Sequence, residues 1–283
     1  MEKIHTYSQY SDILAAFKKD KARCNTNKLL MRDELTELID SGKLYYDEID
    51  DVLWFFVNEG YFYSASFYVS TGTPLKMRKQ DLDVMVELTG NQDRYNDKWE
   101  QELIAAGYEK GDKRIEWSAQ IDDIIDEVRS QLEIRCPRLE KQGMFFRKAT
   151  KADYTELGNL WEMRFGKSRY VLTAMTDAEW KEIEQFGRCD VICDADGKIV
   201  AVYVYSKRNK TACAFHVEAL YQGQGLGSAI LYRLIISAFE EGCTKFTCWI
   251  REDNQESIWM HQHVLTASNK FYRQYICKAE VSK

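Results

Sequence analysis

The stretch LYQGQGLGSAILYRL, residues 220–234, places three of the chain's 15 glycines, Gly223, Gly225 and Gly227, close together. Glycine has no Cβ, so the backbone can turn sharply there or approach another group closely. The apolar pattern predicts a strand before the stretch and a helix after it. A glycine-rich turn that opens a helix presents free backbone N–H groups, which together with the helix dipole favour a phosphate.

This turn could be a P-loop, a dinucleotide-binding loop or a tight packing turn without a ligand. A P-loop needs a lysine after its last glycine, and no lysine lies between Gly223 and Tyr232. A dinucleotide loop needs a third glycine where Ser228 stands, although Glu252 and Asp253 lie where a ribose-binding acid belongs. A tight packing turn without any ligand is the third reading, and the turn alone does not decide among them.

Composition narrows the class of protein. Of the 283 residues, 45% are hydrophobic and 30% charged, as in a globular protein, and no run approaches the roughly 20 apolar residues of a membrane span. The net charge is −6 with scattered basic residues, which does not suit a nucleic-acid partner. The start, MEKIHTYSQY, has no apolar signal region, so we expect a cytoplasmic protein without membrane contact.

The cysteines and histidines do not form a metal pattern. The eight cysteines include no C-x-x-C pair, and the four histidines do not lie beside them at ligand spacing. We therefore expect buried thiols and no metal.

A charged segment, residues 132–143 (LEIRCPRLEKQG), contains Pro137, one of two prolines. It follows an amphipathic helix predicted over 118–133. This segment is the expected linker between two domains, 1–138 and 139–283, each of ordinary size.

The C-terminal domain shows a clear series of expected elements. A hairpin is indicated by Asp196-Gly197 between two β-branched runs. The expected elements are a strand at 144–150, helices at 151–165 and 176–187, a hairpin at 189–206, a strand at 211–220, a helix at 228–242, a strand at 244–250, a helix at 254–264 and a strand at 270–278.

The N-terminal domain repeats this order in outline, with a helix at 31–42, a hairpin at 51–70, strands at 81–88 and 112–117, and a helix at 96–107. Only ten residues separate Ser70 from Asp81, too few for a glycine loop and a long helix. The expected fold class is therefore α+β, with two mixed β-sheet domains flanked by helices.

One family matches both the turn and the element order. The segment Gln222-x-x-Gly225-x-Gly227 resembles the [QR]-x-x-G-x-[GA] signature of the GNAT acetyltransferase superfamily, and the series of elements over 144–283 is similar to that fold. The N-terminal half resembles a second, degenerate GNAT-like unit that lacks the cofactor-binding segment and the CoA site. The resemblance implies acetyl-CoA as cofactor, held by Phe215, Val217, Gln222, Gly223, Gln224, Gly225, Leu226, Gly227, Ser228 and Asn254.

The resemblance implies an N-acetyltransferase that transfers the acetyl group to a primary amine of a small molecule or peptide. The two strands beside the turn should separate, so that free backbone groups near Phe215 to Val217 grip the pantetheine arm. The Val217 N–H would then face the thioester carbonyl. The alternative is a non-catalytic module that binds CoA or serves protein recognition. The acceptor, the role of the N-terminal half and the oligomeric state are left open.

The resemblance also assigns catalytic positions. His261, seven residues after Asn254, stands where the family places the acid that protonates the leaving thiolate, and a histidine can do so near neutral pH. A base is expected on the strand before the turn, with the parity of Val217. The residues there are Thr211, Cys213 and Phe215, none of which is a suitable base, whereas His216 and Glu218 have the opposite parity.

Two further features admit two readings each. The aromatic stretch at residues 53–69 predicts either a hairpin core or a box for a cationic amine. The acidic runs DEIDD (47–51) and DLDVMVEL (81–88) are either solvated segments or an attraction for such an amine.

Overall fold

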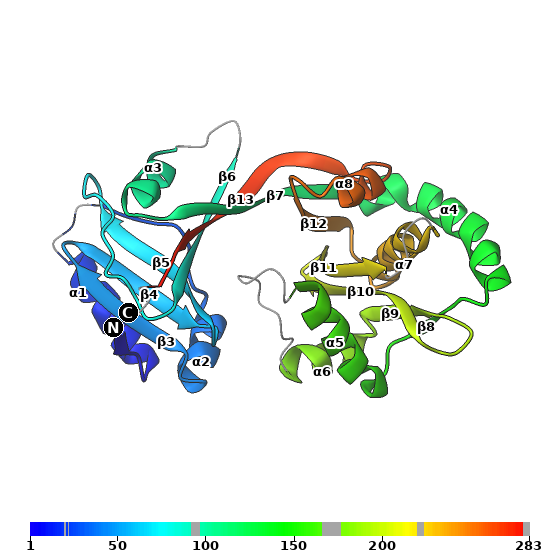
Figure 1. The fold of residues 1–283 in the computed structure, drawn as a ribbon, viewed down its shortest axis with the longest axis horizontal. Coiled ribbons are helices and arrows are strands. Elements are labelled where there is room, and N and C mark those ends of the chain that lie inside the picture. The colour runs from blue at the N-terminus through cyan, green and yellow to red at the C-terminus, as the bar shows by residue number, and fades with distance from the viewer. Residues whose placement is uncertain (20, 22, 92–96, 166–176, 220–223, 280–283) are drawn as a thin grey trace. The chain divides into compact units, whose positions relative to one another are not determined.

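The computed structural model describes residues 1–19, 21, 23–91, 97–165, 177–219 and 224–279. It has an α+β fold in which one mixed sheet runs through the whole chain, in the order β1-β3-β4-β5-β6-β13-β7-β12-β11-β10-β9-β8 (Figure 1). The chain divides into two compact units, which are described separately below: unit 1 is residues 1–114 with 270–283, and unit 2 is residues 115–269.

Unit 1 begins with a short strand and two helices and continues with a meander of strands. Its elements are β1 (Glu2–Lys3), α1 (Tyr7–Lys18), β2 (Cys24–Thr26), α2 (Arg32–Asp40), β3 (Leu44–Ile49), β4 (Val52–Asn58), β5 (Phe62–Ser70), β6 (Asp83–Asn91) and α3 (Lys98–Ala105).

Unit 2 follows the same order of strands, with two further long helices. Its elements are α4 (Ile121–Lys141), β8 (Phe145–Lys148), the 3-10 turn η1 (Lys151–Asp153), α5 (Tyr154–Phe165), α6 (Asp177–Phe186), β9 (Cys189–Cys193), β10 (Ile199–Arg208), β11 (Thr211–Ala219), α7 (Leu226–Glu240), β12 (Lys245–Arg251) and α8 (Gln255–His261). The hairpin turn expected at Asp196-Gly197 is confirmed, with Gly197 at φ 83°.

Two long strands, β7 (Glu109–Gln120) and β13 (Thr266–Cys277), each contribute residues to both units. In unit 1 the order β1-β3-β4-β5-β6 is completed by β13, and in unit 2 the matching order β8-β9-β10-β11-β12 is completed by β7. Along the chain, β7 directly follows the elements of unit 1, and β13 directly follows the elements of unit 2. The two repeats have therefore exchanged their last strands.

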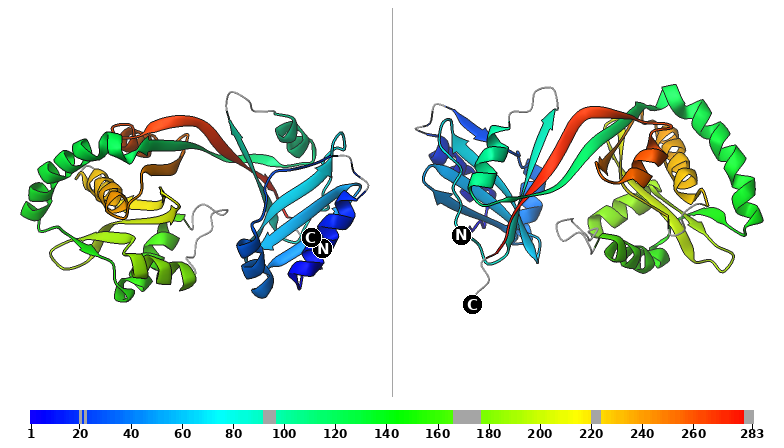
Figure 2. Two further views of the ribbon diagram at one scale, coloured as in Figure 1. Left: turned by 180° about the vertical axis from the view of Figure 1, so that it is seen from behind. Right: turned by 45° about the horizontal axis from the view of Figure 1, so that its top comes forward.

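The sheet of unit 2 is covered on both faces (Figure 2). Helices α4 and α7 pack against one face over a core that includes Tyr203, Ala214 and Ile230. Helices α5 and α6 cover the other face over a core that includes Val202 and Val204. Helix α7 is apolar on nearly all sides because it lies between α4 and the sheet.

In unit 1 the segment between β5 and β6, residues 71–82, contains no helix. Large side chains pack against this segment: Trp54, Phe56 and Phe67 are fully buried in one core together with its Leu75. The Trp54 indole donates to the carbonyl oxygen of Lys76 at 2.7 Å, which holds the helix-free segment against the sheet. The aromatic stretch is thus a hairpin core, and not an amine box.

The boundary between the units differs from the expected linker. Residues 132–141 belong to α4, which continues through Pro137 and keeps one buried face from Ile121 to Leu139. The contacts divide instead at residues 114/115 and 269/270, inside β7 and β13. The charged residues of this segment lie on the solvent-facing side of α4 and do not form a linker. The helical spacing of apolar residues continues on both sides of Pro137, which indicates one uninterrupted helix.

All eight cysteines are free thiols; five are buried and three are partly buried. Among the described residues, no group of three or more His, Cys, Asp or Glu side chains is placed to hold a metal ion. None of the described helices has the length and apolar character that a membrane crossing requires.

Candidate cofactor site

The central feature of unit 2 is a split between two parallel strands. Strands β11 and β12 pair from Thr211↔Lys245 to Ala214↔Cys248. Both strands continue beyond this point, to Ala219 and Arg251, but among the described residues they no longer pair with each other. The expected separation of these strands is present, and it leaves backbone groups of β11 facing the split.

A β-bulge in β11 lies at the mouth of this split. Along β10, Tyr205 pairs with Ala214 and Val204 pairs with His216, so Phe215 is the extra residue. A bulge leaves one residue unpaired and reverses the alternation of side-chain positions beyond it. Neither the bulge nor its effect is visible in the sequence pattern.

The bulge corrects the expected parity of β11. Val217 pairs with Tyr203, and Ala214 pairs with Tyr205, so both positions belong to the face covered by α7. Thr211 and Cys213 alternate with that face and therefore do not share the face of Val217, contrary to the expectation. Positions 216 and 218 pair with Val204 and Val202, whose side chains contact the core under α5 and α6.

Helix α7 begins at the glycine turn that follows β11. Gly225 is its N-cap residue, with a left-handed φ of 77°, and a Cβ built there would meet nothing within 4 Å. A glycine is thus required for the backbone conformation, and the space beside it is open. The first N–H groups of a helix have no intrahelical partner, and no acidic side chain lies in this first turn. The turn fits the phosphates of a CoA molecule.

The other residues expected in the turn play different parts. Leu226 is buried in the α7 core, so only its backbone can face a ligand. A Cβ at Gly227 would lie 2.8 Å from Met260 Sδ, so this glycine allows α7 and α8 to pack closely. Gln224 is exposed and Ser228 half-buried. Gln222 and Gly223 lie outside the described residues.

Asn254 caps helix α8 directly after β12. Its Oδ1 accepts from the backbone N–H of Ser257 at 3.1 Å, and the side chain is exposed. The carboxamide N–H₂ group takes no part in this cap, so it can also donate to a ligand at the end of β12.

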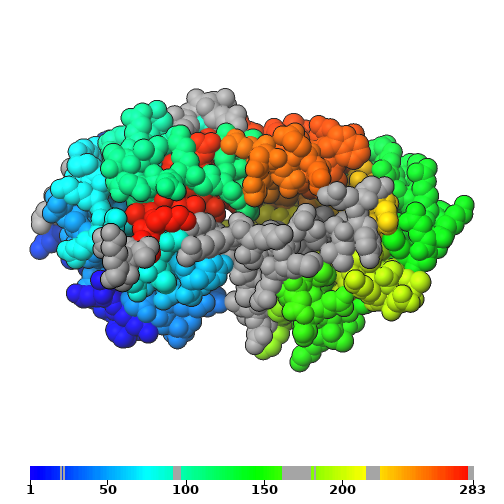
Figure 3. Space-filling model, in the orientation of Figure 1, coloured from blue at the N-terminus to red at the C-terminus, as the bar shows by residue number. Residues whose placement is uncertain are grey.

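His261 is the last residue of α8, and its side chain is only 3% exposed although the helix lies on the molecular surface (Figure 3). Its Nδ1 lies 2.7 Å from the carbonyl oxygen of Ser257, so Nδ1 carries the proton of a neutral ring. Burial lowers the pKa of His261 to about 4. At pH 7 the ring is neutral, and its one N–H proton is bonded to the carbonyl oxygen of Ser257, so this geometry does not favour the expected role as thiolate acid.

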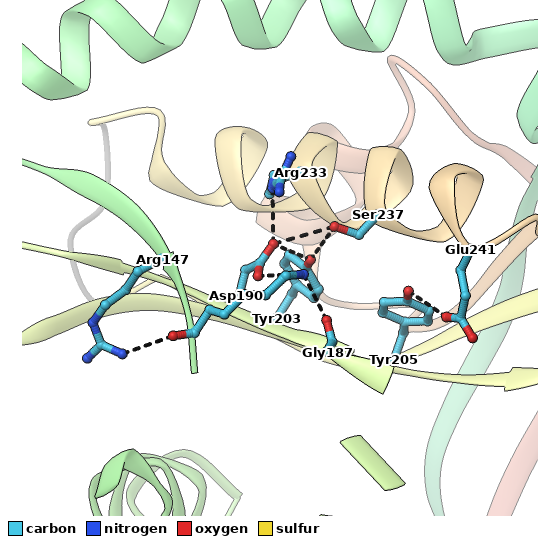
Figure 4. A network of polar contacts seen from close by, with 9 residues as sticks. Arg147, Gly187, Asp190, Tyr203, Tyr205, Arg233, Ser237 and Glu241 are labelled. Carbon is cyan, nitrogen blue, oxygen red and sulfur yellow. Dashed lines mark hydrogen bonds and ion pairs between the residues drawn. The ribbon is translucent and has the colours of Figure 1, made fainter. Parts of the chain in front are cut away.

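A buried polar network, which sequence reasoning missed, fixes α7 to the sheet (Figure 4). Asp190 of β9 is 2% exposed and accepts from the hydroxyl of Tyr203 at 2.5 Å and from Arg233 Nε at 3.0 Å. Ser237 Oγ lies 2.7 Å from the same hydroxyl. The sequence does contain an indication of this network, because Asp190 lies within the otherwise apolar strand sequence CDVIC, where a buried carboxylate needs partners.

A second set of contacts holds the end of the same helix. Glu241, directly after α7, accepts from Arg188 Nη2 at 2.6 Å and from the Tyr205 hydroxyl at 2.8 Å. Because the middle and the end of α7 are tied to the sheet, its N-terminus has a defined place beside the split strands.

Unit 2 thus combines a split pair of parallel strands with a glycine turn and a helix that is fixed to the sheet. Residues 154–265 match the model of the acetyltransferase (GNAT) family, which confirms the resemblance found in the sequence.

Solved structures extend the likeness of fold to the rest of the chain. A tandem GNAT protein from the clavulanic acid biosynthesis pathway has a TM-score of 0.56 at 12% identity, covering 100% of this chain and 99% of that chain. A GCN5-related N-acetyltransferase from Sphaerobacter thermophilus has a TM-score of 0.57 at 12% identity, covering 82% and 78%.

A GNAT-family acetyltransferase from Colwellia psychrerythraea has a TM-score of 0.53 at 10% identity, covering 98% and 99%. A comparison with curated protein sequences finds no match. The tandem GNAT-like architecture is therefore shared along the full chain, at identities that speak for the fold alone.

Proposed function

We propose that the protein is an acetyl-CoA-dependent N-acetyltransferase that acts on a primary amine, and that unit 2 alone binds the cofactor. The observation that carries the proposal is the combination of the β11–β12 split with Gly225 at the start of α7. The first-turn N–H groups of α7 would hold the pyrophosphate, and the free edge of β11 would hold the pantetheine arm.

The role of each group follows from its place. Acetyl-CoA supplies the acetyl group as a thioester. The N–H of Val217, beyond the bulge, would donate to the thioester carbonyl and stabilise negative charge on its oxygen. Asn254 would contact the CoA arm through its free N–H₂ group. The thiolate of CoA would leave without an acid from the chain, because a free thiol ionises near pH 8.5. The thiolate would then take a proton from water, and the attacking amine would lose its proton to water.

Unit 1 is proposed to bind no CoA. The segment 71–82 has no helix whose N-terminus could take the phosphates, and its Leu75 packs in one core with Trp54, Phe56 and Phe67. The stoichiometry expected for the full chain is one acetyl-CoA per molecule.

A titration calorimetry experiment on the full chain tests this proposal, together with CoA-thiol release on a panel of primary amines. Binding of one equivalent and amine-dependent thiol release support it. Absence of acetyl-CoA binding at millimolar concentration overturns it.

A second candidate, a non-catalytic CoA-binding module, is favoured by one observation: His261 is buried and neutral. Binding of acetyl-CoA without thiol release on any amine, from pH 6 to 9, would favour this candidate over the enzyme.

A further inference from the structure

Unit 1 contains a split like the one in unit 2. Strands β5 and β6 pair in parallel from Phe62↔Asp83 to Ala65↔Val86, and beyond this point the described residues of the two strands no longer pair with each other. The free edge of β5 therefore exposes backbone N–H and C=O groups that need partners.

The chain itself lies in this split. The short strand β2 leaves the main order of the sheet and pairs antiparallel with the end of β5, from Cys24↔Ser70 to Thr26↔Tyr68. It binds the edge that β6 has left, in the same way as an added strand binds a free sheet edge.

Asn27, which follows β2, completes the filling. Its Oδ1 accepts from the Phe67 N–H at 2.8 Å, and its Nδ2 donates to the carbonyl oxygen of Glu87 at 3.1 Å. The same Nδ2 lies 3.5 Å from the carbonyl oxygen of Ala65. One carboxamide thus bridges the two separated strands, and it uses its acceptor and its donors at once.

The position of Phe67 matches that of Val217 in unit 2. Ala65 belongs to the last parallel pair of unit 1, and its partner on β4 is Phe56. Phe67 pairs with Trp54, which lies two residues from Phe56 along β4. Val217 lies opposite Tyr203, two β10 positions from the partner of Ala214. Asn27 Oδ1 therefore accepts from the N–H that corresponds to the proposed carbonyl-binding N–H of unit 2.

We propose that unit 1 contains a carboxamide-binding site, formed by the Phe67 N–H and the carbonyl oxygens of Ala65 and Glu87, and that Asn27 occupies it as an intramolecular ligand. With β2 it stands where the cofactor arm would lie in unit 2, an equivalence that rests on the proposed function. The split of unit 1 is filled by its own chain, which closes it to an acyl thioester.

Hydrogen exchange measured by NMR at the Phe67 amide tests the site. In Asn27→Ala this N–H loses its acceptor, so its protection factor should fall on the order of tenfold, with a lowering of Tm by about 3 to 6 °C. The matched control is Asn25→Ala, because Asn25 belongs to the same segment but has an exposed side chain. Unchanged protection of Phe67 in Asn27→Ala overturns the proposal.

A second variant separates hydrogen bonding from space filling. Asn27→Asp keeps the shape of the side chain, but at pH 7.5 a carboxylate would face two carbonyl oxygens. It should lower Tm at least as much as Asn27→Ala does. A variant as stable as the wild type would show that the N–H₂ group is not used, and would contradict the carboxamide site.

Addition of acetyl-CoA distinguishes this proposal from the proposed function. It should raise the protection of the Val217 amide and leave that of Phe67 unchanged. An effect on Phe67 overturns the filled split. If acetyl-CoA has no effect on the Val217 amide, this counts against the proposed function. The Asn27→Ala experiment uses no acetyl-CoA, so its result does not depend on the proposed function.

Discussion

The Nδ1 atom of His261 lies 2.7 Å from the carbonyl oxygen of Ser257, one turn earlier in α8. The proton in this bond cannot serve catalysis without breaking the contact that closes the helix. The contacts of His261 are therefore structural, whereas its position in the sequence predicted a catalytic role.

Replacement of His261 should change the pH dependence of stability. The pKa of about 4 in the folded state lies below the value of about 6.5 in the unfolded state, so the unfolded state binds the proton more tightly. The stability that the neutral ring contributes is full above pH 6.5 and is lost as the pH falls toward 4. Urea unfolding of the wild type should show this loss, of about 2 to 3 kcal/mol, and His261→Gln should lack it.

The exposed His263 supplies the control, since His263→Gln should keep the acid-induced loss. Turnover should change less than about threefold in His261→Gln, and not by the 100- to 10,000-fold typical of a lost general acid. A larger fall in kcat at unchanged KM would return His261 to the reaction.

Gly225→Val should strongly weaken acetyl-CoA binding. The substitution puts a side chain into the open space beside the α7 N-terminus and forces a β-branched residue to φ 77°. Calorimetry should show affinity lowered by at least about a hundredfold, or about 2.7 kcal/mol.

The control for strain is Gly242→Val, at the other end of α7. Gly242 has φ 81° and equally open space, so its substitution has a similar backbone cost without lying near the turn. Equal loss of affinity in both variants would mean that strain, and not the phosphate site, is responsible.

Gly227 should be coupled to Met260. An alanine Cβ at position 227 would lie 2.8 Å from Met260 Sδ, although alanine is favoured over glycine in a helix by about 1 kcal/mol. Gly227→Ala should therefore stabilise the Met260→Ala background more than the wild type. Denaturant unfolding of the four proteins should give a coupling energy of about 0.5 to 2 kcal/mol. Additive effects would show that α7 and α8 do not approach as closely as described.

Asp190→Ala should clearly destabilise unit 2. It leaves Arg233 Nε and Lys148 Nζ, now 3.0 and 2.8 Å from the carboxylate, without their buried partner. Both cations are partly exposed and can be solvated in the variant, so the expected loss is about 2 to 3 kcal/mol by urea unfolding. Ser237→Ala removes one contact of the same network and should cost only about 1 kcal/mol. Similar losses in the two variants would contradict the central place of Asp190.

Much of unit 2 could be predicted because its elements carry local signals. Gly225 requires a left-handed backbone, the Asp196-Gly197 turn requires a hairpin, and the run after Gly227 has the apolar character of an enclosed helix. Each of these properties depends on a single residue or on the spacing of apolar residues within a short segment, so it can be recognised in the sequence alone.

The features that were missed depend on pairing between distant segments. The bulge at Phe215 exists only in the register of β11 on β10, so the parity argument for Thr211 and Cys213 was wrong beyond it. The burial of His261 depends on how α8 packs, and neither Asn27 nor β2 carries a local signal of its role.

The exchange of β7 and β13 has a consequence for synthesis. A ribosome delivers β6 early, but its neighbour β13 emerges only after every element of unit 2. Unit 1 must therefore wait with an open sheet edge while the second repeat is made, and truncation inside residues 270–277 would damage the first half of the protein. A fragment starting near residue 140 would likewise lack β7, so the two halves cannot be dissected at the middle of the chain.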